Sequence, residues 1–309
     1  MKKILILANS SGGLYDFRNE LVLRLLKSYE VVVSLPDDVG PRELAEEGCR
    51  VIHTAINRRG VNPKEDISLL LSYRRLIQDE KPDLVLTYTI KTNVYGSFCR
   101  RMARVPYVET VTGFGSSFEK KGLFLHMIVA MYRTALKKAE CIFFQNRENR
   151  QIFESYHIRG KQPELVSGAG VNLKRHPMEP PGRRYDCFFL YVGRMMREKG
   201  IEELLAAAEA LHSEKTQFWL LGYPNEDYEE KLQKAEKEGC IRLLPSDPDV
   251  HGYLAKASAL VLPSYHEGMS NVLMEASATG RPVITTTVSG CKEVFRGRSN
   301  GFWMPERRQ

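Results

Sequence analysis

Short apolar runs rich in β-branched residues alternate with longer segments of helical periodicity in the first half of the chain. Apolar runs of this length predict buried strands, and apolar positions three or four residues apart predict helices packed on one side. We expect strands at 3–8, 30–35, 50–54, 83–88, 107–111 and 141–145. Between them we expect helices at about 15–28, 41–48, 64–80, 93–104, 123–139 and 147–156. This alternation predicts a doubly wound parallel sheet with helices on both faces.

The second half of the chain repeats this plan. We expect strands at 187–194, 217–222, 241–245, 259–264 and 282–287, and helices near 200–213, 226–238, 250–257 and 270–279. The stretch GAGVNLKRHPMEPPGRRYD (168–186) has three prolines, three glycines and no apolar period, which is typical of a linker. We therefore predict an α/β protein with an N-terminal domain (1–167), a linker (168–186) and a C-terminal domain (187–309). Two such domains place a ligand cleft between them, at the carboxyl ends of the strands.

The composition fits a globular protein of this size. A chain of 309 residues suits two domains, and 43% hydrophobic residues supply enough apolar material for two cores. The six cysteines are scattered without a C-x-x-C motif, which favours reduced thiols in a cytoplasmic protein over a disulfide framework or a zinc site. The opening MKKILILANSSGG has too short an apolar run for a secretory signal and predicts the first strand.

The positive charge is unevenly placed. Residues 1–165 carry 26 Lys and Arg against 19 Asp and Glu, whereas residues 166–309 carry 19 of each kind, so the net charge of +7 belongs to the first half. A basic half is suited to nucleic acid, anionic lipid or a phosphorylated substrate. Nucleic acid is the weakest of the three, because no RNA-binding aromatic motif, zinc finger or helix-turn-helix pattern stands out.

The segment HEGMSNVLMEASATGRP (266–282) contains two glutamates, Glu267 in the loop before a predicted helix and Glu275 in its second turn. The N–H groups and the dipole at the start of that helix suit a diphosphate. The glutamates alone leave two interpretations open: solvated charges, or contacts with the two ends of one ligand. The segment YVGRMMREKG adds Arg194 and Lys199 after another strand, where two cations can neutralise a leaving diphosphate. Either cation alone is more often a solvated charge, but the combination favours the ligand interpretation.

Four motifs of the second half, VGR…EKG, VLPS, EGMSNVLMEA and GRPVI, occur in an order that closely resembles the donor domain of family 4 glycosyltransferases of the GT-B fold. In the first half, INRRGVNPKEDI, KPDLVLTYTIKTNVYGS, VTGFGSSF and FFQNREN are similar to one branch of that family. This branch contains bacterial enzymes of capsule and exopolysaccharide synthesis that add a hexose or N-acetylhexosamine to undecaprenyl-diphosphate-linked saccharides. The resemblance implies two Rossmann-like domains and a retaining transfer from a nucleotide sugar, usually a UDP-sugar, without a bound metal or cofactor.

The resemblance also implies roles for the candidate residues. Glu267 would contact the hydroxyls of the donor sugar, Glu275 the ribose, and Arg194 and Lys199 the diphosphate. We take Glu267, Arg194 and Lys199 as the candidate catalytic residues. The other candidate donor-binding residues are Gly12, Gly13, Gly193, Gly268, Met269, Ser270, Asn271 and Val272. Without the resemblance, Gly12 and Gly13 indicate only a tight turn where a helix opens.

Candidate acceptor-binding residues follow the fourth and fifth predicted strands. Thr89, Lys91 and Asn93 lie at the end of the fourth strand, and two interpretations are open: helix capping by Asn93 with a solvated Lys91, or acceptor binding. Thr112 and Gly113 occupy the loop where many family members have a histidine. This departure leaves no obvious side-chain base, which is consistent with a mechanism in which the leaving phosphate accepts the acceptor proton.

The segment KKGLFLHMIVAMYRTALKK (120–138) is apolar in the middle and basic at both ends. Its uncharged run is shorter than the ~20 residues of a membrane span. It predicts either a buried helix with ordinary flanking charges or a helix that contacts anionic lipid through Lys120, Lys121, Lys137 and Lys138. The second interpretation suits a polyprenyl-linked acceptor and predicts a protein that is peripheral to the inner face of the cytoplasmic membrane.

The chain ends at NGFWMPERRQ, whereas the family normally continues for some tens of residues, so the resemblance implies an incomplete C-terminal domain. A non-catalytic nucleotide-sugar-binding protein is therefore one alternative. A nucleotide-sugar epimerase of the same architecture would need a histidine-rich cleft, and the seven histidines do not cluster in the sequence. An NAD-dependent oxidoreductase is disfavoured because the glycine-rich dinucleotide fingerprint is absent.

Overall fold

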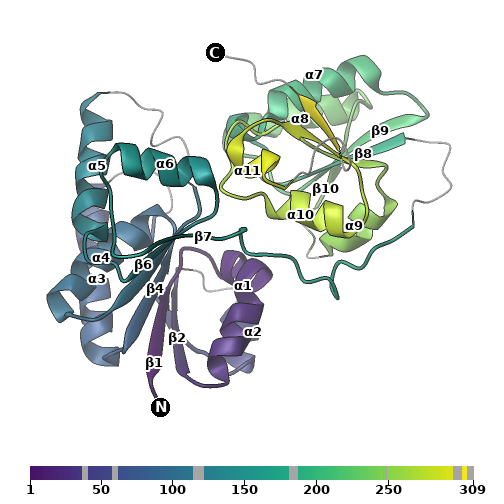
Figure 1. The fold of residues 1–309 in the computed structure, drawn as a ribbon. Coiled ribbons are helices and arrows are strands. Elements are labelled where there is room, and N and C mark those ends of the chain that lie inside the picture. Colours follow the sequence, from purple (N-terminus) through teal and green to yellow (C-terminus); the bar gives the residue numbers. More distant parts are fainter. Residues whose placement is uncertain are drawn as a thin grey trace. The chain divides into compact units, whose positions relative to one another are not determined.

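The computed structural model describes residues 1–36, 41–57, 62–113, 122–180, 187–245, 247, 249–294 and 301–304. The chain folds into two compact units, Met1–Ala169 and Gly170–Gln309 (Figure 1). Each unit is built around its own parallel sheet, as the alternation of strands and helices predicts. Among the helices of the described segments, none combines the length and the apolar character that a membrane crossing requires.

The first unit contains a seven-stranded sheet in the order β3-β2-β1-β4-β5-β6-β7. Its strands are β1 (Lys3–Leu7), β2 (Glu30–Leu35), β3 (Arg50–His53), β4 (Leu84–Tyr88), β5 (Tyr107–Val111), β6 (Cys141–Phe144) and β7 (Pro163–Leu165). Its helices are α1 (Ser11–Leu26), α2 (Pro41–Glu46), α3 (Pro63–Glu80), α4 (Ile90–Ala103), α5 (Leu123–Leu136) and α6 (Arg147–Ser155). The paired strands are all parallel and the order runs outward from β1, so the sheet is doubly wound.

Alternate residues of β1 belong to two separate cores, as a parallel strand covered on both faces requires. Ile4 and Ile6 pack with residues of α1 and α2, whereas Leu5 and Leu7 pack with residues of α3, α4 and α5. Figure 1 shows α1 and α2 on one side of this sheet and α3, α4 and α5 on the other. The faces of the sheet are therefore filled, and the loops at the carboxyl ends of the strands remain for a ligand.

The second unit contains a six-stranded parallel sheet in the order β10-β9-β8-β11-β12-β13. Its strands are β8 (Cys187–Val192), β9 (Thr216–Leu221), β10 (Arg242–Leu244), β11 (Ala259–Leu262), β12 (Val283–Thr286) and β13 (Gly301–Met304). Its helices are α7 (Ile201–Leu211), α8 (Glu229–Lys237), α9 (Val250–Lys256), α10 (Asn271–Ala278) and α11 (Ser289–Lys292), with the short 3-10 helices η2 (Arg197–Lys199) and η3 (Glu226–Tyr228). Strands β8 and β11 are neighbours, which brings the connections that follow them together.

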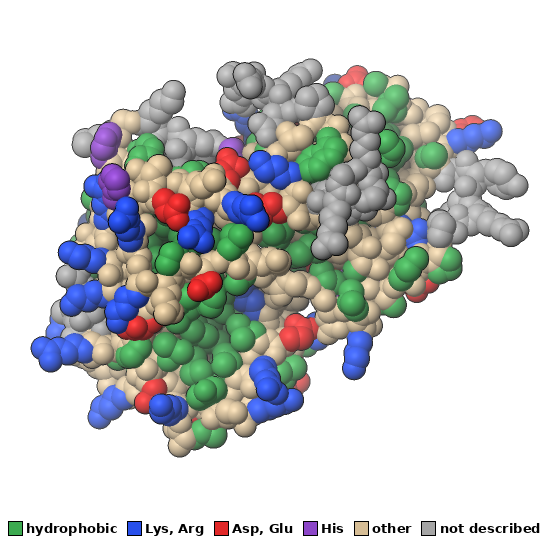
Figure 2. Space-filling model, in the orientation of Figure 1, with side chains coloured by type: hydrophobic (Ala, Val, Ile, Leu, Met, Phe, Trp, Pro, Cys, Tyr) green, Lys and Arg blue, Asp and Glu red, His purple; other side chains and the backbone are tan. Residues whose placement is uncertain are grey.

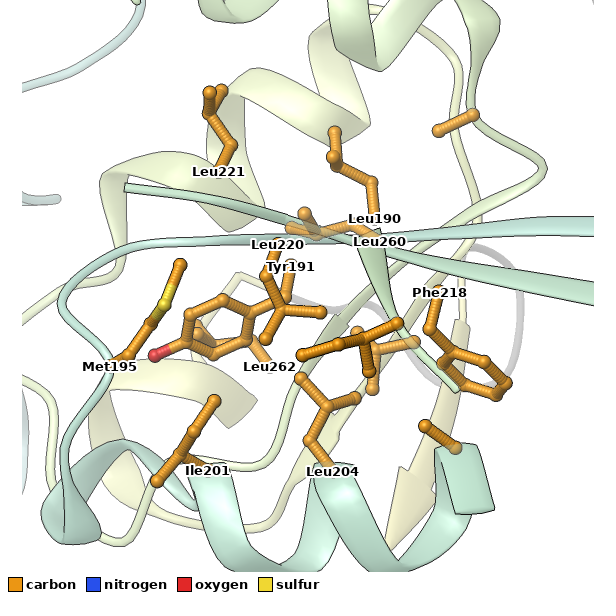
Figure 3. Packing of buried hydrophobic residues seen from close by; sticks show 14 of the residues in the cluster. Leu190, Tyr191, Met195, Ile201, Leu204, Phe218, Leu220, Leu221, Leu260 and Leu262 are labelled. Carbon is orange, nitrogen blue, oxygen red and sulfur yellow. The ribbon is translucent and has the colours of Figure 1, made fainter. Parts of the chain in front are cut away.

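Tyr191, near the carboxyl end of β8, is a buried core residue just before the first of these connections. Figure 3 shows the Tyr191 ring on the same side of the sheet as Ile201 and Leu204 of α7, with Leu190 and Leu221 on the other side. Tyr191 is buried, and so are the four leucine and isoleucine side chains around it. The rigid core therefore begins immediately before the loop that contains Arg194.

Some elements differ from the sequence prediction. Strand β7 (Pro163–Leu165), strand β13 and helix α11 were not predicted. The exposed PEL sequence of β7 has no apolar run, and α11 has only four residues. Helix α1 begins at Ser11, before the predicted start near residue 15. The Ser10 hydroxyl caps it by accepting a hydrogen bond from the backbone N–H of Gly13 at 3.2 Å. Two glycines in its first turn conceal this start, because glycine is unfavourable inside helices.

Candidate functional site

Lys199 and Glu267 form an ion pair at the carboxyl ends of β8 and β11. The Lys199 Nζ atom lies 2.6 Å from Glu267 Oε1, and the two side chains are 20% and 11% exposed. The Ser264 hydroxyl donates a second hydrogen bond to the same carboxylate oxygen, at 2.8 Å. The structure therefore brings two of the predicted catalytic residues into direct contact. It adds Ser264, which belongs to the VLPS motif and received no role from the sequence.

The loop that contains Glu267 is held by close backbone packing. Gly200 has a φ of 69°, and a Cβ atom there would lie 2.1 Å from the Pro263 carbonyl oxygen. A Cβ atom on Gly290 would lie 2.6 Å from the carbonyl oxygens of both Glu267 and Gly268. Distances this short exclude any side chain, so only glycine fits at the two positions. Both glycines thus determine where the carboxylate of Glu267 is placed.

The backbone at Arg194 is fixed while its side chain is exposed. The Tyr191 hydroxyl donates to the Arg194 carbonyl oxygen at 2.7 Å, and the Gly193 N–H donates to the Leu221 carbonyl oxygen at 3.0 Å. Burial raises the pKa of the Tyr191 hydroxyl, the Glu267 charge raises it further, and Arg194 acts in the opposite direction. Tyr191 therefore stays protonated and continues to donate this hydrogen bond. No sequence motif singled it out, because its position in a strand predicts only a core residue.

Helix α10 presents its N-terminus beside the same loop. Gly268 and Met269 are partly buried in the loop, Ser270 is the N-cap residue, and Asn271 and Val272 open the helix. The Ser270 side chain makes no capping hydrogen bond within the described residues. The first N–H groups of the helix thus keep the donor capacity and the positive dipole end that suit an anion.

Glu275 is partly buried in the second turn of α10, as predicted. The Cys291 thiol of α11, close to Glu267 and Lys199, is fully buried. Burial and the Glu267 charge raise the pKa of Cys291 to about 12, although the Thr285 and Thr286 hydroxyls and Lys199 oppose the shift. The thiol therefore stays neutral and fills space behind the Lys199–Glu267 pair.

In the first unit, Gly12 and Gly13 form the first turn of α1, at the carboxyl end of β1. Arg18, one turn further along, donates from Nη1 to the Gly13 carbonyl oxygen at 3.3 Å. Its guanidinium carbon lies 4.5 Å from the centre of the Tyr88 ring, within the range of a cation–π contact. Burial lowers the pKa of Arg18. These contacts connect the start of α1 to the end of β4.

Lys91 and Asn93, which follow β4, are neither a solvated charge nor a helix cap. Thr89 has a φ of 79°, which is rare for a β-branched residue and lets α4 start directly after the strand. Lys91 is not solvated, because its Nζ atom lies 2.8 Å from Asp66 Oδ1. Asn93 is not a cap: it is 1% exposed and its Nδ2 donates to the Thr110 carbonyl oxygen at 3.0 Å. The interpretation of Asn93 as a cap and of Lys91 as a solvated charge is therefore wrong.

Thr112 and Gly113 follow β5 and are partly buried. Strand β5 pairs with β4, with Tyr88 opposite Thr110, so the ends of both strands lie at one edge of the sheet. Gly113 has a φ of 130°, a conformation that favours glycine. Thr89 and Thr112 therefore belong to the same loop region at the carboxyl edge of the first unit.

The basic segment is only partly described. Lys137 and Lys138 follow α5 and are exposed, whereas Lys120 and Lys121 lie outside the described residues. Helix α5 buries Val129, Tyr132 and Leu136 in the core and leaves Met127 43% exposed. Figure 2 shows many Lys and Arg side chains over the part of the surface that the first unit occupies in this view. One side of α5 therefore packs in the core, and its opposite side, with Met127, is exposed to solvent.

The acidic residues of the described segments form no group of three or more metal-ligating side chains with His or Cys. Asp247 and Asp249 have the D-x-D spacing, but both are used locally. Asp247 Oδ1 accepts from the Asp249 N–H at 2.8 Å, and Asp249 Oδ1 accepts from the Gly252 N–H at 3.0 Å, which caps α9. This pair therefore has a structural role in the loop before α9.

Comparison with known proteins identifies the class. Residues 187–309 match the family model described as Glycosyl transferases group 1, and residues 3–146 match the model described as Glycosyl transferase 4-like. Together the matches span most of the chain, and the chain belongs to the glycosyltransferases of the GT-B fold. The expectation from the sequence motifs is confirmed at this level.

Individual relatives extend the similarity over the whole chain. The chain is 24% identical to N,N'-diacetylbacillosaminyl-diphospho-undecaprenol alpha-1,3-N-acetylgalactosaminyltransferase of Campylobacter jejuni, over 97% of this chain and 85% of that protein. It is 25% identical to UDP-Gal:alpha-D-GlcNAc-diphosphoundecaprenol alpha-1,3-galactosyltransferase of Escherichia coli, over 79% of this chain and 68% of that protein. The crystal structure of Anabaena Alr3699/HepE with UDP and glucose matches with a TM-score of 0.78 and 18% identity, over 99% of this chain and 86% of that one. At 18% identity, the match to the HepE structure shows a shared fold and nothing beyond it.

Proposed function

We propose that this glycosyltransferase moves a hexose or an N-acetylhexosamine from a UDP-sugar to a lipid-linked saccharide, with retention of the anomeric configuration. The observation that carries the proposal is the Lys199–Glu267 pair beside the start of α10. An ammonium with three N–H donors can bond to Glu267 and to a phosphate oxygen at once. The carboxylate then accepts hydrogen bonds from sugar hydroxyls, while α10 and Arg194 contact the diphosphate.

The chemistry follows from these positions. The bond between the anomeric carbon and the phosphate oxygen breaks, and a bond to the acceptor hydroxyl oxygen forms on the same face of the sugar. The acceptor proton moves to the leaving phosphate oxygen, so the products are UDP and the extended saccharide. Negative charge grows on the diphosphate as the bond breaks, and Lys199, Arg194 and the N–H groups of α10 stabilise it. We propose that these groups supply the positive potential without a bound metal.

The remaining donor contacts complete this assignment. Glu275 accepts hydrogen bonds from the ribose hydroxyls, and the N–H groups of Asn271 and Val272 contact the phosphates, whereas the Ser270 N–H donates to the Gly290 carbonyl oxygen at 3.2 Å. Gly193, Gly268 and Met269 belong to the same loops, and we keep Gly12 and Gly13 of the first unit as candidate donor contacts. A UDP donor is supported by the donor that the name of the Escherichia coli relative specifies and by the UDP bound in the HepE structure.

The acceptor is proposed on similar grounds. The names of both relatives specify a saccharide linked through diphosphate to undecaprenol. In this chain Thr89, Lys91, Thr112 and Gly113 lie at the carboxyl edge of the first unit, where the acceptor would bind. Asn93 is too buried for direct contact and instead fixes α4 against β5.

A lipid-linked acceptor requires approach to a membrane. We propose that the outer side of α5 and the exposed Lys137 and Lys138 after it contact anionic lipid at the inner face of the cytoplasmic membrane. Lys120 and Lys121, which precede α5 in the sequence and lie outside the described residues, are proposed for the same contact from the sequence alone. The exposed Met127 and the exposed lysines after α5 support this placement. Basic residues near an anionic surface contribute about 1 kcal/mol each.

The direct test is a transfer assay with UDP-glucose, UDP-galactose and their N-acetylamino forms. The acceptor probe is N-acetylglucosaminyl-diphosphoundecaprenol in detergent, and mass spectrometry detects the lipid product. NMR of the released saccharide gives the configuration of the new bond. UDP binding without transfer or hydrolysis of any of these donors would identify a non-catalytic binding protein and contradict the proposal.

A further inference from the structure

Two segments far apart in the sequence meet at one carboxylate in the first unit. Asp66 belongs to the INRRGVNPKEDI motif and lies in the first turn of α3, whereas Lys91 and Tyr95 belong to the YTIKTNVYG motif and lie in α4. Lys91 Nζ lies 2.8 Å from Asp66 Oδ1, and the Tyr95 hydroxyl lies near the same carboxylate, whose charge contributes to its raised pKa. We call these three residues the Asp66 cluster.

Local structure sets the position of the Asp66 cluster. Asn62 caps α3 by accepting from the Lys64 N–H at 3.2 Å, which places Asp66 in the first turn. On the other side, the positive φ of Thr89 lets α4 begin immediately after β4, which places Lys91 in its first turn. Helices α3 and α4 pack side by side on one face of the sheet (Figure 1). The cluster therefore lies at the carboxyl end of β4, beside Thr89.

The charge balance of the cluster determines which ligand chemistry it fits. The Lys91 ammonium is already compensated by Asp66, so the pair has no net charge to attract a diphosphate. A phosphate brought to Lys91 would also meet the Asp66 carboxylate, whose Oδ1 lies 2.8 Å from the ammonium. Phosphate recognition thus belongs to the second unit and not to this cluster.

The same groups fit hydroxyl groups well. A carboxylate offers about four acceptor positions, of which Lys91 uses one, and an ammonium offers three donors, of which Asp66 uses one. Vicinal sugar hydroxyls are both donors and acceptors, so they need such a mixed set. The Lys91 and Asp66 side chains are 16% and 8% exposed, and Tyr95 is half-buried. Burial and Asp66 raise the pKa of Tyr95 to about 12, which keeps its hydroxyl protonated.

We propose that Asp66, Lys91 and Tyr95 form a subsite that binds hydroxyl groups of the acceptor's terminal sugar. This inference rests on the proposed function, because it requires a saccharide acceptor. The proposal assigns the two parts of the acceptor to different places. The Asp66 cluster binds the terminal sugar, and the diphosphate that links the sugar to the lipid binds outside the cluster. The proposal also gives two of the four first-unit motifs a common role, since each of the two contributes one side of the cluster.

The test measures binding of soluble probes that do not require transfer. Saturation-transfer NMR with the methyl α-glycosides of N-acetylglucosamine, N-acetylgalactosamine and galactose reports sugar binding, and phosphorus NMR with inorganic pyrophosphate reports phosphate binding. The variants are Asp66→Asn, Lys91→Gln and Tyr95→Phe. The matched controls are Asp79→Asn and Lys64→Gln, which make the same changes at exposed residues of α3.

We expect the three cluster variants to weaken glycoside binding about tenfold or more, because each removes a hydrogen bond that involves a charged group. Pyrophosphate and UDP binding should stay unchanged, as should every property of the two controls. Tyr95→Phe keeps the ion pair intact, so it tests the proposal even if the Asp66 or Lys91 variant fails to fold. Thermal unfolding identifies any variant that does.

Two results with the glycosides would overturn the subsite: no glycoside binding by the wild-type protein, or equal glycoside binding by wild type and Tyr95→Phe. Dependence of pyrophosphate binding on Lys91 would assign the cluster to phosphate and would also reject the inference. The transfer assay tells rejection of the subsite apart from rejection of the proposed function. Glycoside binding that depends on Tyr95 in a protein without transferase activity would support the subsite and contradict the function.

Discussion

Removal of the Lys199 ammonium tests the centre of the candidate site. In Lys199→Ala, Glu267 loses a partner at 2.6 Å, and the Ser264 hydroxyl at 2.8 Å is among the contacts that it keeps. The carboxylate is then a poorly solvated charge, since its side chain is 11% exposed. We therefore expect two separate effects, one on folding and one on turnover.

The effect on folding follows from the exposure of the pair. Breaking a fully buried ion pair costs about 3–5 kcal/mol, whereas exposed pairs contribute about 0–1 kcal/mol. The 20% and 11% exposed fractions place this pair between these limits. Because Ser264 still bonds to Glu267, we expect a loss of about 1–3 kcal/mol in the free energy of unfolding. Urea denaturation of the wild type and the variant measures it.

The effect on turnover has a different origin. Loss of one preorganised group that stabilises developing charge lowers kcat by about 10²–10³. The double variant Lys199→Ala, Glu267→Gln also removes the carboxylate charge that Lys199 balanced, so it should recover most of the lost stability and none of the activity. An unchanged urea midpoint in Lys199→Ala would refute the assignment of a strong ion pair. A higher KM with an unchanged kcat would refute the assignment to the leaving diphosphate.

Three other predictions concern the donor and the membrane. Glu275→Ala should weaken UDP binding by about 1.5–3 kcal/mol for each lost charge-assisted hydrogen bond to the ribose, and equal calorimetric affinity would contradict this role. Transfer should persist in EDTA, whereas complete loss that Mn²⁺ or Mg²⁺ restores would refute the metal-free mechanism. Glutamine at Lys120, Lys121, Lys137 and Lys138 should release the protein from anionic liposomes without changing UDP binding. Wild-type binding should also weaken as salt shortens the Debye length from about 10 Å at 0.1 M to about 3 Å at 1 M. Equal co-sedimentation with neutral and anionic vesicles would return α5 to the role of a core helix.

The fold was predictable because most strands are buried on both faces and therefore read as continuous apolar runs. The runs at β1, β2 and β8 show this, since nearly all of their residues are buried or partly buried. Prediction failed for β7, whose three residues are all exposed at the sheet edge. It also failed at the start of α1, where the cap Ser10 precedes two residues that are poor helix formers.

The candidate site was predictable as a set of residues but not as a set of contacts. Motif spacing placed Lys199 and Glu267 after neighbouring strands, yet they are 68 residues apart and nothing in the sequence specifies a direct ion pair. Tyr191 and Gly290 escaped notice because their roles depend on the backbone of other segments. Tyr191 binds the Arg194 carbonyl oxygen, and Gly290 accommodates the carbonyl oxygens of the Glu267 loop. Such roles exist only once the loops have packed.

The ion pairs of the first unit also change how its surplus of positive charge is interpreted. The sequence assigns the whole surplus of +7 to the first half, which left anionic lipid and a phosphorylated substrate as the favoured partners of that half. In the structure, Lys91 is compensated by Asp66, and Lys3 is compensated by Glu80 and Glu30. Exposed residues such as Lys137 and Lys138 are placed to present positive charge to a surface rather than to a small ligand. In the second unit, by contrast, a helix start adds positive potential beside Lys199 without adding net charge. A unit with a balanced composition is therefore the better candidate for the diphosphate, and the basic unit is the better candidate for the lipid.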